Sequence, residues 1–201
     1  IGTYTITVTD PSNSCTSTDT VSVLSNTTPP DANAGAIQTI TCTTSSVVLN
    51  GSSVTTGATF NWAGAGIVSG GTTATPTVNT GGTYTVTVTD PANGCTSTST
   101  VTVSSNTTAP IADAGTLQNI GCGVSTAILD GSGSGSGASI IYNWTTSGGN
   151  IVSGGTSTSP VVDLGGVYTI TVTDTSNGCT STDTVSVISS PTPVASFSAT
   201  P

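Results

Sequence analysis

Two residue types in this chain, aspartate and cysteine, combine chemical reactivity with regular spacing. All nine acidic residues are aspartates, whereas Lys, Arg, His and Glu are absent. General acid–base catalysis needs a group tuned to titrate near neutrality, and a Ser or Cys nucleophile needs a neighbouring base. Widely spaced aspartates supply neither. The sequence therefore predicts that this segment is not an enzyme.

The charge of the chain limits its partners and its surroundings. Its net charge is −9 with no basic side chain, so no residue can neutralise a nucleic-acid phosphate or an anionic lipid headgroup. No apolar run reaches the roughly 20 residues that a membrane helix needs, so we expect no membrane insertion in this segment. A surface without Lys or Arg also resists trypsin-like proteases, which favours an extracellular or cell-surface location.

The aspartates suggest a candidate calcium site, because Ca²⁺ takes six to eight oxygen ligands, often from several loops. We expect no other cofactor. In the second of two repeats, the start of the first strand and the ends of two later strands place three carboxylates at one pole, with an amide facing them across the junction: Asp113, Asp130, Asp174 and Asn79. The weaker equivalent set is Asn33, Asn50 and Asp90. The alternative is that these side chains cap local turns.

The five cysteines fall into two classes. Cys42 and Cys122 follow a first strand, whereas Cys15, Cys95 and Cys179 open a last strand. One disulfide per repeat is the default outside the cell, which pairs Cys42 with Cys95, Cys122 with Cys179, and Cys15 with an upstream partner. The two turns should lie at opposite poles of a sandwich, so a bond from Cys42 to Cys179 is the alternative.

One module occurs three times and sets the domain organisation. It reads YTITVTDPSNSCTSTDTVSV at 4–23, and close copies occupy 84–103 and 168–187. Spacings of about 80 residues suit whole β-sandwich domains. The predicted divisions are 1–28, the C-terminal part of a preceding repeat; 29–108 and 109–190, two complete repeats; and 191–201, a linker with the first strand of a further domain.

Alternation of apolar residues with threonine predicts strands, and nothing indicates a helix. In the first complete repeat the strands are expected near 36–41, 46–50, 58–63, 74–79, 83–90 and 95–104. The aromatic residues Trp62 and Trp144 are expected in the core, as in immunoglobulin-type sandwiches. The predicted fold is all-β, with tandem immunoglobulin-like domains in an extended array.

Several motifs together resemble a known family. They are AG-x-x-Q-x-I-x-C, N-W, G-x-Y-T-V-T-V-T-D and N-G-C-T-S-T-D-T-V. This pattern is similar to the PKD-like, immunoglobulin-like repeats of large secreted surface proteins of Bacteroidota-type bacteria, including gliding-motility and other adhesins. The resemblance implies a secreted stalk or adhesin. It also implies O-glycosylation at Thr20 and Thr184, with Thr100 bare because Ser99 replaces the aspartate of that pattern.

We therefore expect an extracellular structural or adhesive repeat segment that forms a stalk, rod or filament. Its partners would be neighbouring repeats of one long chain, or other copies in a filament. The alternatives are a glycan- or protein-binding module that uses loops 64–73 and 131–139, and a spacer of a larger secreted enzyme. Residues 1–25 could instead complete a sandwich on a neighbouring chain by strand addition.

Overall fold

The computed structural model describes residues 1–190 and 196, and in that part every regular element is a β-strand. No helix of membrane-spanning length and hydropathy occurs among these residues. The chain divides into two compact units. Unit 1 comprises Ile1–Gln38 and Val48–Val103, and unit 2 comprises Thr39–Val47 and the described residues from Ser104 onward.

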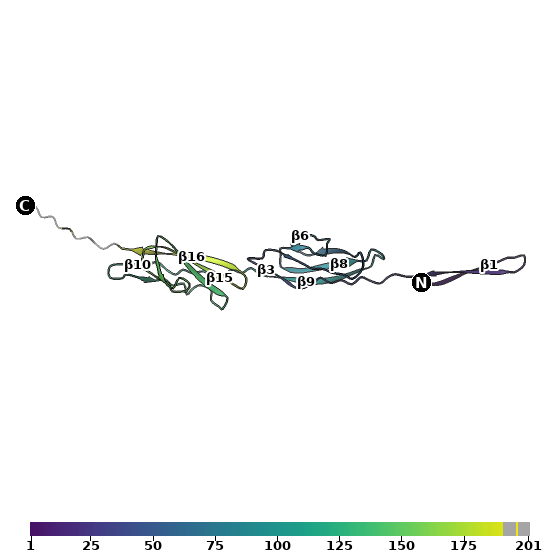
Figure 1. Cartoon of the computed structure of the whole chain (residues 1–201), viewed down its shortest axis with the longest axis horizontal. Coiled ribbons are helices and arrows are strands. Elements are labelled where there is room, and N and C mark those ends of the chain that lie inside the picture. The colour runs from purple at the N-terminus through teal and green to yellow at the C-terminus, as the bar shows by residue number, and fades with distance from the viewer. Residues whose placement is uncertain (191–195, 197–201) are drawn as a thin grey trace, which may run out of the picture. The chain divides into compact units, whose positions relative to one another are not determined.

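The chain begins with a hairpin of β1 (Gly2–Thr9) and β2 (Thr16–Val23), which pair antiparallel. The first sandwich has a four-stranded sheet in the order β3 (Gln38–Thr41), β9 (Thr96–Asn106), β8 (Gly82–Thr89) and β5 (Thr59–Ala63). Its second sheet has the order β4 (Val47–Val48), β7 (Thr77–Val78) and β6 (Ile67–Ser69). Figure 1 shows β8 beside β9, joined by a tight hairpin turn.

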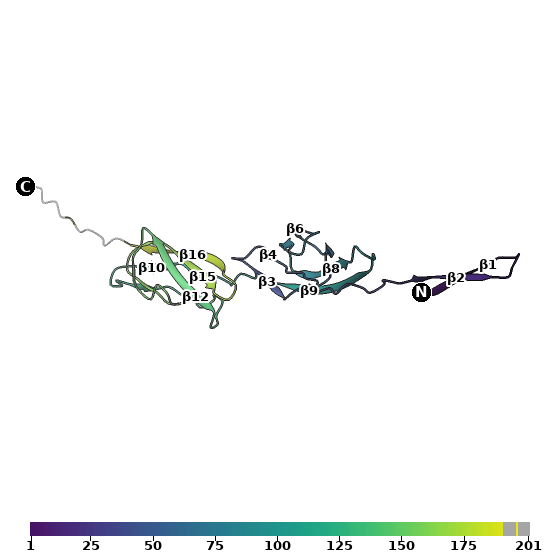
Figure 2. The same cartoon turned by 45° about the vertical axis from the view of Figure 1, so that its right-hand side comes forward.

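The second sandwich repeats this order. Its larger sheet runs β10 (Gln118–Ile120), β16 (Cys179–Ser189), β15 (Gly166–Asp174) and β12 (Ile140–Ser147), and Figure 2 shows β12 alongside β15. The smaller sheet runs β11 (Ala127–Ile128), β14 (Val161–Val162) and β13 (Ile151–Ser153). β10 is parallel to β16, whereas β15 is antiparallel to both of its neighbours. This order is that of an immunoglobulin-type sandwich, as predicted.

The alternation along β8 and β15 explains the two cores. Tyr84, Val86 and Val88 are fully buried, and the threonines between them point away from the core. The matching residues of β15 pack with Leu129, Trp144 and Val162 in one buried cluster. Because side chains alternate between the two faces of a strand, this pattern buries one face and leaves the other to solvent. The predicted core positions of Trp62 and Trp144 are confirmed.

Each core also contains a buried tyrosine with a satisfied hydroxyl. The Tyr84 hydroxyl donates to the carbonyl oxygen of Thr80 at 2.6 Å, and the Tyr168 hydroxyl donates to that of Leu164 at 2.6 Å. Burial raises the pKa of Tyr84. These bonds tie the start of the long strand to the preceding loop, as in the tyrosine corner of immunoglobulin domains.

The predicted strands are present in shortened form, and two further strands occur. The segment expected at 74–79 is a regular strand only at Thr77–Val78. Pro76 has no amide proton to donate to a neighbouring strand, although its carbonyl oxygen accepts the Leu49 amide at 2.9 Å. The additional strands are β6 and β13. Each has three residues and an irregular register, so alternation along the sequence is too short to reveal it.

Candidate functional site

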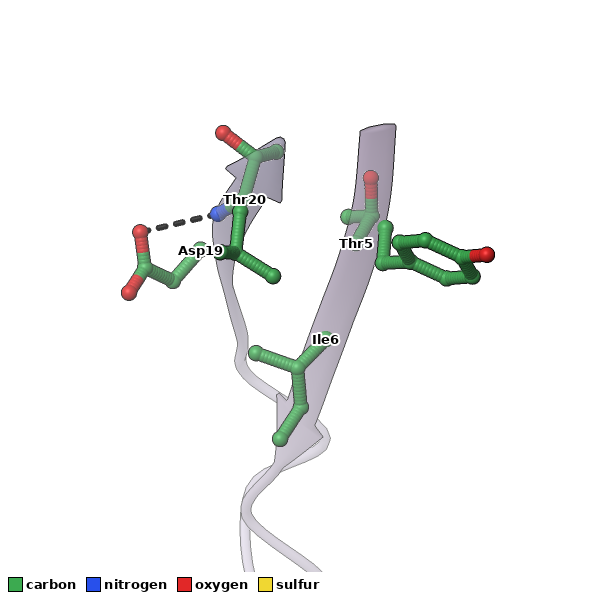
Figure 3. A pocket seen from close by; sticks show the side chains of 6 residues that line it. Thr5, Ile6, Asp19 and Thr20 are labelled. Atoms are coloured by element: carbon green, nitrogen blue, oxygen red, sulfur yellow. Dashed lines mark hydrogen bonds between the residues drawn. The ribbon is translucent and has the colours of Figure 1, made fainter. Parts of the chain in front are cut away.

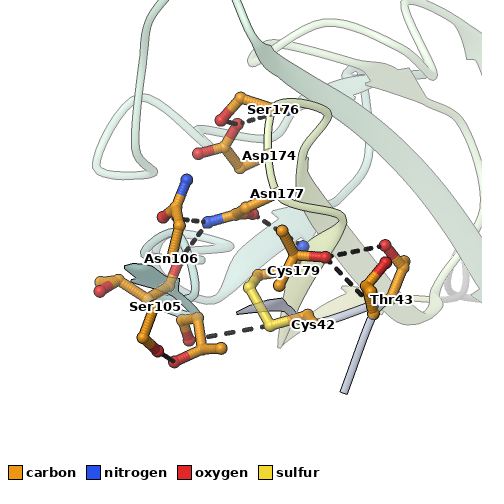
Figure 4. The surroundings of a disulfide bond; sticks show 12 residues. Cys42, Thr43, Ser105, Asn106, Asp174, Ser176, Asn177 and Cys179 are labelled. Carbon is orange, nitrogen blue, oxygen red and sulfur yellow. Dashed lines mark hydrogen bonds between the residues drawn. A yellow bond between two sulfur atoms is a disulfide. The ribbon is translucent and has the colours of Figure 1, made fainter. Parts of the chain in front are cut away.

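The covalent feature of the fold is a cystine between Cys42 and Cys179, two residues that belong to different sequence repeats (Figure 4). Cys42 directly follows β3, and Cys179 is the first residue of β16. Their Cα atoms are 5.0 Å apart, within the range that disulfides require. Residues 39–47 belong to unit 2, so the bond lies inside that unit although it joins residues 137 positions apart.

The turn between β15 and β16 presents Cys179. The Asp174 carboxylate accepts hydrogen bonds from the amide and the hydroxyl of Ser176, at 2.9 and 2.7 Å, and these bonds lower the pKa of Asp174. Gly178 has φ +70° and donates its amide to the Asp174 carbonyl oxygen at 2.7 Å. A positive φ of this kind suits glycine, so the local sequence itself sets the turn.

Asn177 fixes this turn beside Cys42 (Figure 4). Its side chain is buried, and its Nδ2 donates to Asn106 Oδ1 and to the Thr108 carbonyl oxygen, both at 3.0 Å. Its Oδ1 accepts the Cys179 amide at 2.9 Å, and its backbone oxygen accepts the Cys42 amide at 3.2 Å. A buried amide with both ends bonded holds one position, so the two sulfur atoms are kept together by more than their own bond.

Unit 1 contains the same asparagine clamp without the cystine. Asn93 Nδ2 donates to Asn26 Oδ1 at 3.1 Å and to the Thr28 carbonyl oxygen at 3.0 Å, and Asn93 Oδ1 accepts the Cys95 amide at 2.8 Å. Sequence reasoning missed these asparagines. The signal was available, because an asparagine stands two residues before the hairpin-turn cysteine in all three modules.

The predicted pairs Cys42–Cys95 and Cys122–Cys179 are wrong. Ile120, two residues before Cys122, pairs with Ser189 at the far end of β16, whereas Cys179 begins that strand. The ten intervals between consecutive residues of this strand, at about 3.4 Å each, separate its two ends by roughly 34 Å, far beyond the reach of a disulfide. The bond found is the alternative, Cys42–Cys179, and the other three cysteines are unpaired. An upstream partner for Cys15 stays a prediction.

The candidate calcium ligands are engaged in their own loops. Asp113 accepts the Gly115 amide at 2.8 Å and Asp130 accepts the Ser132 amide at 3.0 Å, and hydrogen bonds from Ser132 lower the pKa of Asp130. Two residues of the weaker set are also bonded within their own loops. The Asn33 side chain accepts the Gly35 amide, and the Asp90 carboxylate accepts the Ala92 amide.

Asn79 accepts the Thr80 hydroxyl at 3.1 Å, within unit 1. Within residues 1–190 and 196, no three Asp or Cys side chains gather into a group that could hold a metal ion. Calcium binding stays a prediction. A calorimetric titration of the chain and of an Asp130→Asn variant with CaCl₂ tests it.

The two predicted glycosylation residues, Thr20 and Thr184, are exposed on strands, and their modification stays a prediction. The aspartate before Thr184 has a structural contact. Asp183 Oδ2 accepts the Ala114 amide at 2.8 Å, and this bond and one from the Thr184 amide lower the pKa of Asp183. In the first repeat the equivalent residue is Ser99, and its hydroxyl oxygen accepts the Ala34 amide at 3.2 Å.

The hairpin of β1 and β2 has the register of the equivalent hairpins but an open apolar face. Five of its side chains are 46–62% exposed, whereas their equivalents on β8 and β9 are at most 5% exposed: Tyr4, Ile6, Val8, Val21 and Val23. A shallow concavity of about 200 Å³ lies along this hairpin. Figure 3 shows Ile6 and Asp19 on its neighbouring strands, with the Asp19 carboxylate bonded to the Thr20 amide. Its lining consists of apolar and threonine side chains together with Tyr4 and the carboxylate of Asp19.

Comparison with known proteins gives weak likenesses to tandem β-domain proteins. The titin I-band fragment I67–I69 aligns at 13% identity and a TM-score of 0.39, over 81% of this chain and 66% of that one. Immunoglobulin domains 1–5 of Sidekick-1 align at 12% identity and 0.39, over 94% of this chain and 46% of that one. Drosophila N-cadherin EC1–4 aligns at 12% identity and a TM-score of 0.41, over 87% of this chain and 52% of that one.

The chain thus spans about two thirds or less of the length of these structures. No protein-family model matches the sequence. No curated protein matches it either. The values are too low for the role of any of these proteins to be transferred.

Proposed function

We propose that this chain is a structural repeat segment of an extracellular or cell-surface protein, a stalk-like spacer whose sequence repeats are joined by a covalent bond. The observation that carries the proposal is the cystine from Cys42 to Cys179. Disulfides persist in oxidising surroundings outside the cytosol, which supports an extracellular location. The resemblance to PKD-like repeats of secreted bacterial surface proteins agrees with this assignment.

The position of the cystine has a mechanical consequence. When the two ends of the chain are pulled apart, tension that arrives at Cys42 passes through the sulfur atoms to Cys179. The polypeptide between them, which includes most of both sandwiches, then carries no tension. Bonds within each repeat would leave the connection between the repeats to be loaded. A spacer that must stay folded under tension is the function for which this arrangement is useful.

The surface agrees with a spacer more than with a recognition module. Aromatic residues make up 4% of the chain, and Trp62, Trp144, Tyr84 and Tyr168 are buried. Interaction hot spots favour Trp, Tyr and Arg, and this chain contains no Arg. Serine and threonine supply much of the polar surface, because charged residues make up only 4% of the chain.

Force spectroscopy on single molecules tests the proposal. With the cystine intact, a chain held at both ends should withhold the 137-residue segment from extension. Reduction should release about 450–490 Å of additional contour length, at 3.3–3.6 Å per residue. A release near 180 Å would correspond to a bond within one repeat, and no release would show that no cystine carries the load; either result would reject the proposal.

A further inference from the structure

The two halves of the cystine differ in their access to solvent. Cys42 is exposed, whereas Cys179 is 1% exposed. Thiol–disulfide exchange begins when a thiolate reaches one sulfur of the bond, and access decides which sulfur is attacked. A small thiol in solution should therefore attack the cystine at Cys42, and Cys179 should supply the sulfur that leaves.

The surroundings of Cys42 come from three segments inside the sequence. Residues 41–44 form its own turn, in which the Thr41 amide donates to the Thr44 carbonyl oxygen at 3.0 Å. The Cys42 sulfur lies 3.7 Å from the Thr107 carbonyl oxygen, and the Cys42 amide donates to the Asn177 carbonyl oxygen at 3.2 Å. Cys42 is exposed with all of these contacts in place, so the folded junction leaves a thiol an approach to it.

Cys179 is held by hydrogen bonds that do not involve its sulfur atom (Figure 4). Its amide donates to Asn177 Oδ1 at 2.9 Å, and Asn177 Nδ2 donates to two oxygen atoms of residues 106–108, both at 3.0 Å. Asn93 makes the same set of bonds beside Cys95, which is not part of a cystine. These bonds therefore form without a sulfur–sulfur bond next to them.

The side chain of Thr43 adds a close packing contact between the two turns. A Cβ on Gly178 would overlap Thr43 Cγ2, so the backbone of the hairpin turn lies directly against this side chain. The contact joins the residue after Cys42 to the residue before Cys179. When the cystine is reduced, this packing and the bonds of Asn177 should keep the two sulfur atoms within reach of each other.

From these features we propose that the cystine is a reversible redox latch, which a small thiol such as glutathione opens at Cys42 and which closes again because Cys179 stays in place. The latch sets which part of the chain bears tension. When it is closed, the segment between the two cysteines carries no tension, and when it is open, that segment carries the full tension. The inference rests on the proposed function for this mechanical role.

Opening and closing are thiol–disulfide exchange reactions. The glutathione thiolate attacks the Cys42 sulfur and forms a mixed disulfide, while the Cys179 sulfur leaves with the electron pair and takes up a proton. A second glutathione thiolate then attacks the glutathione sulfur of the mixed disulfide and releases Cys42. The cystine gains two electrons, and two glutathione molecules become one oxidised glutathione. In closing, the Cys179 thiolate attacks the mixed disulfide at Cys42 and displaces glutathione.

The first test maps the mixed disulfide on the full chain. The substitutions Cys15→Ser, Cys95→Ser and Cys122→Ser leave the two junction cysteines as the reactive groups. The oxidised protein is treated briefly with reduced glutathione, quenched with acid, digested and mapped by mass spectrometry. We expect glutathione on Cys42 at least about tenfold more often than on Cys179, and about equal amounts on both when the reaction is run in urea, because unfolding removes the difference in access.

The second test measures closing in the same background. The reduced chain is mixed with oxidised glutathione, and the Cys42–Cys179 bond is followed by acid quenching and mass spectrometry. Asn177→Ala should slow closing at least about tenfold, because the effective concentration of one sulfur at the other falls when the turn is no longer held. The matched control is Asn93→Ala, which removes the same bonds in unit 1 and should leave the rate within about twofold.

The cystine map of the oxidised chain separates this proposal from the spacer proposal. Absence of the Cys42–Cys179 bond from that map would reject both. The latch alone is rejected if the bond is present and glutathione is found on Cys179 as often as on Cys42 in the folded chain. It is also rejected alone if Asn177→Ala closes as fast as Asn93→Ala.

Discussion

Replacement of Cys42 by serine removes the cystine and keeps a side chain of similar size, so it isolates the contribution of the covalent bond. The chain-entropy relation for a 137-residue separation gives about 5 kcal/mol. Native disulfides typically contribute about 2–4 kcal/mol, so we expect Cys42→Ser to lower the free energy of unfolding of unit 2 by about 3 kcal/mol. For a unit of this size, the melting temperature should fall on the order of 10–20 °C.

Differential scanning calorimetry in a non-reducing buffer measures this effect. Cys179→Ser should reproduce it, the double variant should add nothing to either single change, and a reducing agent should lower the wild-type transition by the same amount. The matched controls are Cys95→Ser and Cys122→Ser, which remove unpaired thiols and should change stability by less than about 0.5 kcal/mol.

One result would refute the reasoning. The bonds would lie within the repeats if Cys42→Ser and Cys95→Ser destabilised one unit. Cys122→Ser and Cys179→Ser would then destabilise the other. If all four variants melted at the same temperature as the wild type, no cystine would form in solution.

Three further predictions concern the surroundings of the cystine and the core of unit 2. Asn177→Ala removes both linker bonds and should cost about 2 kcal/mol by chemical denaturation, whereas the exposed Asn13→Ala should cost under about 0.5 kcal/mol. Because its folded pKa is lowered, Asp183 contributes stability that is present above its ordinary pKa of 3.8 and is lost as pH falls through the folded value. In melting curves from pH 6 to 2, Asp183→Ser should therefore reduce the fall of the melting temperature at acid pH. Tyr168→Phe removes the bond to Leu164 and should lower the melting temperature of unit 2, by about 1–2 kcal/mol of unfolding free energy; no change would show that this hydroxyl bond does not stabilise the corner.

Much of the fold was predictable because it depends on local patterns. Alternation along 84–88 puts Tyr84, Val86 and Val88 on one face of the strand, and that face is buried where a second sheet covers it. The hairpin turns were equally readable, since Asp, Asn and Gly at fixed offsets satisfy the turn by bonds within six residues. Short paired segments such as β6 were not readable, because pairing with a distant strand defines them.

The site divides in the same way. Residue types and spacing alone established which side chains are present: cysteines in two classes, no basic groups, and aspartates at turns. The expectations of no nucleic-acid binding and no catalysis rest on that composition and stay predictions. The choice of partner was decided by tertiary structure. Strand β16 places its two ends roughly 34 Å apart, so Cys122 cannot reach Cys179, while Asn177 seats the turn of Cys179 beside Cys42. The spacing of cysteines along the sequence does not give the distance between them in the folded chain, and a disulfide depends on that distance.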